Sequence, residues 1–146
     1  MQALVARTPY GMPRRTAVGF DYNRVNMLLA ILEKRLGMDF GTQDVYVNVV
    51  GGARVTEPAA DLAVIAAIVS SYRNKPVMPG ILAVGEVGLT GEVRRVGFVE
   101  RRIKEAQNLG FQKFVTPTGN LSAKSLPTGI IQVNTVEEAL AAFFEK

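Results

Sequence analysis

The chain has 146 residues, of which 48% are hydrophobic and 21% charged, so it can form the core of one domain of ordinary size. It contains neither cysteine nor histidine, which excludes disulfides, a thiolate nucleophile and a Ser-His-Asp triad, and makes a transition-metal site unexpected. The formal net charge is +4, and no apolar run is long enough to cross a bilayer, so we expect a cytoplasmic protein without a membrane anchor.

The first part of the chain predicts two short strands and a helix. Residues 2–6 and 16–19 read as strands, joined by a loop that contains two prolines and a glycine. Asp21 is a suitable N-cap for a helix over residues 22–36, where apolar side chains recur at helical spacing. Gly37 suits the left-handed position that ends a helix.

The next stretch predicts a strand, a glycine loop and a second helix. Val45, Val47 and Val49 alternate as in a strand, and two glycines follow that strand at residues 51–52. The helix opens at Pro58 and runs to residue 73. Such a helix start presents free N–H groups and partial positive charge, where enzymes often place a nucleophile. Here Ala59 and Ala60 follow the proline, and neither has a reactive group.

The second half alternates short strands and helices. A strand at residues 80–87 should form a β-hairpin with residues 92–96. A helix at 99–109 and strands at 113–116 and 130–133 follow. The last helix should run through residue 144 and open on a capping box of Thr135 and Glu138. The helix at 99–109 should turn Val99, Ile103, Ala106 and Leu109 inward. The pattern predicts an α/β (α+β) fold with some parallel pairing and residues 1–146 as a single domain.

Few residues are candidates for catalysis. The glycine-rich segments lack the Walker A pattern, so we do not expect this chain to hydrolyse ATP. Glu57 and Asp61 are spaced to share a helix face, but acidic residues at a helix start are more simply explained by the helix dipole. The serines have no flanking signature of an activated nucleophile.

Positive residues are grouped. The candidates for contact with an anionic partner are three adjacent pairs, Arg14 and Arg15, Arg94 and Arg95, Arg101 and Arg102, together with Lys104. Arginine binds phosphate through a planar fork of donors, so these residues are candidates for sequence-independent DNA binding. A solvated surface, or salt bridges between subunits, is the other interpretation, and both stay open at this point.

Three segments together resemble the proteolytic domain of Lon proteases. They are G-G-A-R-V-T-E-P-A-A-D-L-A, G-E-V-G-L-T-G-E-V-R-R-V-G and E-R-R-I-K-E-A-Q-N-L-G, at residues 51–63, 85–97 and 100–110. The resemblance implies a Lon-like fold with a mixed sheet, a β-hairpin and packed helices. Lon uses a Ser-Lys dyad, and Ala59 and Glu100 occupy the two matching positions here. The resemblance therefore implies a pseudoprotease; the alternative is a residual peptidase or peptide-binding domain.

Residues 14–37, together with the degenerate dyad, are similar to the C-terminal Lon-like domain of the RadA (Sms) family of bacterial DNA repair proteins. This resemblance implies a fragment of a longer DNA-dependent ATPase of homologous recombination, whose zinc-binding and RecA-like ATPase parts lie outside this chain. It also implies a homo-hexamer, DNA and the RecA recombinase as partners. ATP, magnesium and zinc would belong to those other parts, with no cofactor in this chain.

Overall fold

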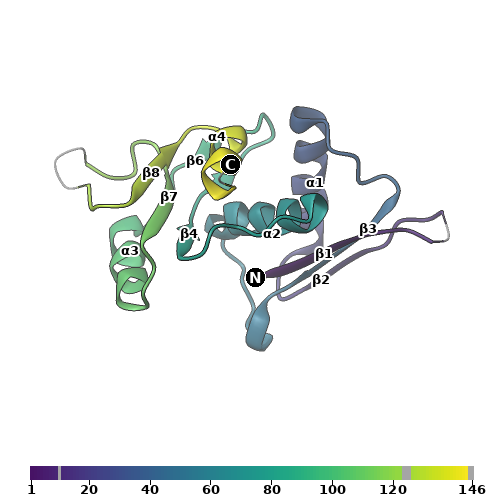
Figure 1. Cartoon of the computed structure of the whole chain (residues 1–146), viewed down its shortest axis with the longest axis horizontal. Helices are drawn as coiled ribbons and strands as arrows, with labels where there is room; N and C mark the ends of the chain where they lie inside the picture. The colour runs from purple at the N-terminus through teal and green to yellow at the C-terminus, as the bar shows by residue number, and fades with distance from the viewer. Residues whose placement is uncertain (10, 123–125, 145–146) are drawn as a thin grey trace.

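The computed structural model describes residues 1–9, 11–122 and 126–144. The fold is mixed α/β, as predicted, with four helices and three small sheets in the described part. Helix α2 (Asp61–Arg73) runs through the middle of the molecule, between the sheet formed by the first strands and the sheet formed by the later ones (Figure 1).

The first sheet contains β1 (Gln2–Arg7), β2 (Arg15–Val18) and β3 (Gln43–Asn48) in the order β1-β3-β2. Strand β3 runs antiparallel to β1 and parallel to β2. The parallel pair requires a crossover, which is helix α1 (Tyr22–Leu36). The α1 bounds are those predicted: Asp21 accepts hydrogen bonds from the backbone of Asn23 and Arg24, and Gly37 is left-handed.

The later strands form a parallel sheet and a hairpin. The parallel sheet contains β4 (Ile81–Ala83), β7 (Lys113–Pro117) and β8 (Ile130–Val133), in the order β4-β7-β8. The hairpin pairs β5 (Glu86–Val87) with β6 (Val93–Arg94). Helices α3 (Val99–Asn108) and α4 (Val136–Phe143) complete this half. The Thr135 hydroxyl accepts from the Glu138 N–H, which confirms Thr135 as the N-cap, and the Glu138 carboxylate accepts from the Asn134 N–H.

Two hydrophobic clusters hold these elements together. The larger cluster joins α1, α2, β3 and α4, and Leu28, Leu62 and Ile65 in it are fully buried. The smaller cluster lies under α3 and includes Val99, Ile103, Ala106 and Phe114. Because α2 contributes most of its length to the larger cluster, its position is fixed from several sides.

Three predictions need correction. The strand predicted at residues 80–87 is broken at Val84 and Gly85, so that β4 and β5 belong to different sheets. The helix predicted from Pro58 begins as a 3-10 turn over Pro58–Ala60 (η2), and α2 proper starts at Asp61. Leu109, predicted to face inward, is 79% exposed because α3 ends one residue earlier. The segment between the strands predicted at 113–116 and 130–133 lies partly outside the described residues.

Candidate functional site

The start of α2 is fixed by the break between β4 and β5. The backbone N–H of Gly85 donates to the Ala59 carbonyl at 2.9 Å, and the Leu62 N–H donates to the Gly85 carbonyl at 3.3 Å. A Cβ on Gly85 would come within 2.8 Å of the Leu62 side chain and 2.9 Å of Val93. Gly85 is therefore required for close approach, and the interrupted strand serves to hold the helix start.

The two positions that the sequence resemblance matched to the Lon dyad, Ala59 and Glu100, carry no nucleophile and no amine. Ala59 lies in η2 with its methyl group buried, 6% exposed. Glu100 is exposed in the first turn of α3, where its negative charge suits the helix dipole. A methyl group cannot attack a carbonyl, and a carboxylate is not the amine base of a Ser-Lys dyad.

Asp61 is a buried carboxylate held by an arginine of α1. It has no exposed surface, and the Arg24 side chain contacts both of its oxygens; the Arg24 Nε to Asp61 Oδ1 distance is 2.6 Å. The Val87 backbone N–H donates to Asp61 Oδ2 at 2.9 Å. These bonds join α1, α2 and the β5–β6 hairpin at one point. The hydrogen bonds from Arg24 to Asp61 raise the pKa of the Arg24 guanidinium above its usual value.

Glu57 is joined to α3 by a second ion pair. Arg102 donates to both Glu57 oxygens, at 3.0 and 2.7 Å, and also to the Gly97 carbonyl at 3.0 Å. Arg102 lowers the pKa of Glu57, and Glu57 in turn raises the pKa of Arg102. Glu57 and Asp61 are thus each paired with a different arginine, which argues against shared acid–base work by the two carboxylates.

The seven basic candidates do not form one patch. The loop between β1 and β2, which precedes Arg15, lies at one end of the long axis, and α3 lies at the other (Figure 1). Two of the seven side chains each form several hydrogen bonds within the protein. Arg15 donates to the Phe40 carbonyl at 2.8 Å, and Arg102 binds Glu57. Arg94 forms an exposed ion pair with Glu92 at 3.2 Å.

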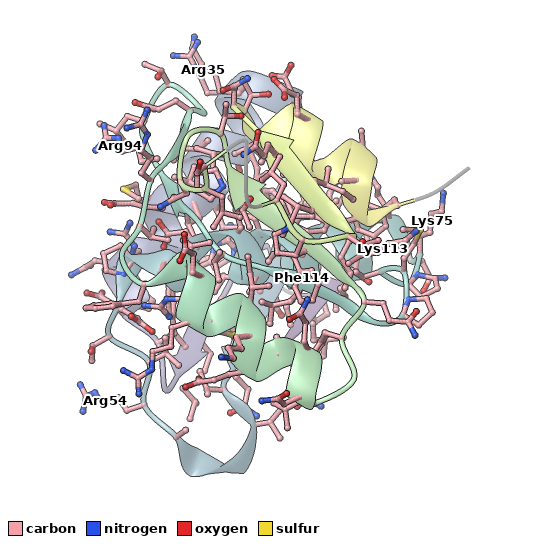
Figure 2. All side chains as sticks on the ribbon, turned by 90° about the vertical axis from the view of Figure 1, so that its left-hand side faces the viewer. Arg35, Arg54, Lys75, Arg94, Lys113 and Phe114 are labelled. Atoms are coloured by element: carbon pink, nitrogen blue, oxygen red, sulfur yellow. The ribbon has the colours of Figure 1, made fainter. Side chains whose placement is uncertain are left out.

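The candidates with more accessible charge are Arg14, Arg95, Arg101 and Lys104, all exposed. Viewed with α3 toward the reader, Arg35, Arg54 and Arg94 lie along one edge of the molecule, and Lys75 and Lys113 lie at the opposite edge (Figure 2). We call Arg35, Arg54 and Arg94 the basic edge. Sequence reasoning missed Arg35 and Arg54, because it selected adjacent arginine pairs and neither of these two has a neighbouring arginine.

Ser70, Ser71 and Lys75 line one groove beside the C-terminal end of α2. They are not arranged as a catalytic Ser-Lys dyad. The Ser70 hydroxyl donates to the Lys75 backbone carbonyl at 2.7 Å, and the Ser71 hydroxyl accepts from the Val5 N–H at 2.8 Å. Among the described residues, no hydrogen bond joins the Lys75 ammonium to a serine. The geometry therefore offers no activated nucleophile there.

Comparison with known proteins assigns a family. A family model described as subunit ChlI of Mg-chelatase matches residues 5–120. The chain belongs to this family. The described residues of this ChlI-family chain hold no group of three or more His, Cys, Asp or Glu side chains that could bind a metal ion. None of the helices that the structure describes is long and apolar enough to span a membrane.

Individual relatives carry a different name. The chain is 49% identical to the DNA repair protein RadA of Halalkalibacterium halodurans and 50% identical to that of Bacillus subtilis, over 142 residues in each case. These alignments cover 96% of this chain and 31% of each relative. The RadA protein of Streptococcus pneumoniae is 47% identical over 146 residues, covering 99% of this chain and 35% of the relative. The chain therefore spans about a third of the length of these relatives.

Proposed function

We propose that this domain is the non-proteolytic, Lon-like part of a cytoplasmic DNA repair and recombination ATPase. In that protein it would help to hold a hexameric ring together and would bind DNA without regard to sequence. The observation that carries the proposal is the 47–50% identity to proteins named DNA repair protein RadA over nearly the whole chain. That identity favours DNA repair over the magnesium chemistry in the family's description.

The dyad positions support the non-proteolytic part of the proposal. The buried methyl of Ala59 and the exposed carboxylate of Glu100 offer neither nucleophile nor amine base. The Glu57–Arg102 ion pair joins the segments that carry these two positions, which supports a structural role for this region. A domain without catalytic groups can still provide a rigid shape and a charged surface. In this proposal it acts as a scaffold for the ATPase parts of the protein, which works beside the RecA recombinase.

The exposed arginines and lysine support the DNA contact. A net charge of +4 and side chains such as Arg101, which is 78% exposed, provide donors for phosphate oxygens. Binding of this kind depends on counterion release and weakens as salt rises. Arg101, Lys104 and the basic edge are the parts of the surface that we expect to approach the duplex.

The test measures the affinity of the purified chain for a fluorescently labelled duplex by anisotropy over a series of salt concentrations. Three double variants each remove two positive charges: Arg101→Ala with Lys104→Ala on α3, Arg54→Ala with Arg94→Ala on the basic edge, and Lys75→Ala with Lys113→Ala at the opposite edge (Figure 2). The third variant is the control for net charge.

We expect the first two variants to weaken binding. They should also lower the slope of log affinity against log salt by about 1 for each phosphate that is no longer neutralised. The control should change affinity much less. Equal weakening in all three variants would show that only net charge matters, and would remove α3 and the basic edge from the proposal. Unchanged affinity in all three would overturn the DNA contact at these residues.

A further inference from the structure

A groove of about 960 Å³ lies beside α2, away from Ala59 and Glu100. One wall is the start of β1, the other wall is β4, and the floor is a face of α2. Figure 1 shows the N-terminal end of β1 and strand β4 next to the same helix. The groove is therefore bordered by the edges of two different sheets.

Strand β4 turns unpaired backbone groups toward the groove. It is the outer strand of its sheet and pairs with β7 on one side only. The Lys113 N–H donates to the Gly80 carbonyl and the Val84 N–H donates to the Val115 carbonyl, so the even-numbered residues face β7. Ile81 and Ala83 then face the other way by the alternation of a strand, and both line the groove.

Strand β1 does the same from the opposite wall. The Thr8 N–H donates to the Thr42 carbonyl on the β3 side, whereas the Val5 N–H leaves the sheet and donates to Ser71 of α2. Odd-numbered residues of β1 therefore face away from β3. Ala3 is one of them and lines the groove. Among the described residues, no hydrogen bond outside the sheets occupies the outward backbone groups of Ala3, Ile81 or Ala83.

The floor and the charge of the groove limit what could fill it. Ala63, Ala66 and Ala67 project only methyl groups from α2, which leaves room above them. Within the described lining, Lys75 is the only charged side chain and there is no carboxylate. A row of free N–H and C=O groups is satisfied best by another extended backbone, and a single exposed ammonium favours a negatively charged one.

We propose that this groove binds an extended, acidic peptide segment, which adds as a strand to the free edge of β4. The backbone of the peptide exchanges hydrogen bonds with Ile81 and Ala83. Side chains on one face of the peptide lie over Ala63 and Ala67, and an acidic side chain meets Lys75. This inference is independent of the DNA contact, since it uses neither α3 nor the basic edge.

The probe is a blocked octapeptide of alternating valine and threonine with a glutamate at each end, titrated into the isotopically labelled chain and followed by NMR. The peptide should slow amide exchange at Ile81 and Ala83. Ala83→Pro removes the outward N–H while leaving the β4–β7 ladder intact, and Ala67→Leu fills the floor. Ala83→Pro should weaken binding about fivefold, the effect of one net hydrogen bond. Ala67→Leu should also weaken binding, because its side chain occupies the space of the peptide.

Two controls are matched in chemistry. Ala141→Leu adds the same bulk on the exposed side of α4 and should leave peptide affinity unchanged. A peptide with lysines in place of the glutamates should bind more weakly than the acidic one, and Lys75→Gln should abolish that difference. Both results would support the charge preference.

Several results would overturn the proposal. One is the absence of protection at Ile81 and Ala83 at saturating peptide, and another is affinity that Ala83→Pro and Ala67→Leu both leave unchanged. Equal binding of the lysine peptide would overturn the acidic preference. If the chain alone sediments as a dimer with these two amides already protected, the groove belongs to a second copy and the peptide proposal fails.

Discussion

Replacing Arg24 with methionine would leave the Asp61 carboxylate buried with one remaining donor, the Val87 backbone N–H. Asp61 has no exposed surface, so water cannot replace the missing guanidinium without opening the junction of α1, α2 and the hairpin. Methionine keeps the length of the side chain and its apolar packing. The perturbation is therefore mainly the removal of the positive charge and its hydrogen bonds.

Removing one partner of a buried ion pair typically costs about 3–5 kcal/mol. This is a large part of the roughly 5–15 kcal/mol that stabilises a domain. At about 2–4 °C per kcal/mol for a chain of this size, the melting temperature should fall by roughly 6–20 °C. Guanidinium chloride unfolding followed by circular dichroism measures the decrease in the free energy of unfolding directly. The m-value should not change if the original protein and the Arg24→Met variant both unfold in two states.

The control is Arg101→Met on α3. Its side chain is 78% exposed and its Nε lies 3.4 Å from Glu105 Oε1, so the decrease in stability should be below about 0.5 kcal/mol. Adding Asp61→Asn to Arg24→Met should recover part of the stability, because the amide removes the unpaired charge but still accepts from Val87. A decrease below about 1 kcal/mol in Arg24→Met, or strict additivity in the double variant, would refute this reasoning.

Three further predictions concern the same region. Gly85→Ala should lower the free energy of unfolding by about 1–3 kcal/mol through overpacking. Gly97→Ala should change it little, because an added Cβ there meets no atom within 4 Å. Equal effects of the two substitutions in denaturation would contradict the close approach at Gly85. Hydrogen bonds, led by that of the Thr90 hydroxyl, lower the pKa of Glu92 to about 2, so its carboxylate stabilises the fold at pH values above its ordinary pKa of 4.5 and this contribution is lost as pH falls toward 2. Thr90→Val should move the NMR titration midpoint of Glu92 upward, and an unmoved midpoint would contradict this cause. Because Ala59 supplies only a methyl group, the chain should hydrolyse neither casein nor a fluorogenic peptide, and turnover above the blank would contradict the pseudoprotease proposal.

The parts of the fold that depend on local signals were predictable from the sequence. Asp21 and Gly37 mark the ends of α1 by chemistry that acts within one turn, and Thr135 marks the start of α4 in the same way. The break at Gly85 was not predicted, because residues 81–84 form an apolar run that Glu86 and Val87 continue in the pattern of one strand. What interrupts the strand is its contact with the start of α2, which is far away in sequence.

The candidate site was predicted less completely, for a similar reason. The residues at the dyad positions, Ala59 and Glu100, could be read directly from the chain. The pairing of Arg24 with Asp61 could not, because the two residues are 37 positions apart and have no shared motif. Likewise, adjacent arginines are equivalent in the sequence, but Arg102 is bound to Glu57 while Arg101 is largely exposed.

The most direct test of the central proposal is sedimentation velocity of the chain with a labelled duplex, at low and at high salt, and without DNA. We predict that the chain sediments with the duplex at low salt and releases it at high salt, with a slope of about 0.9 for each phosphate neutralised. The run without DNA reports whether the chain assembles by itself. The absence of a complex at low salt, or a complex that salt does not affect, would contradict a domain that uses its positive surface to bind DNA.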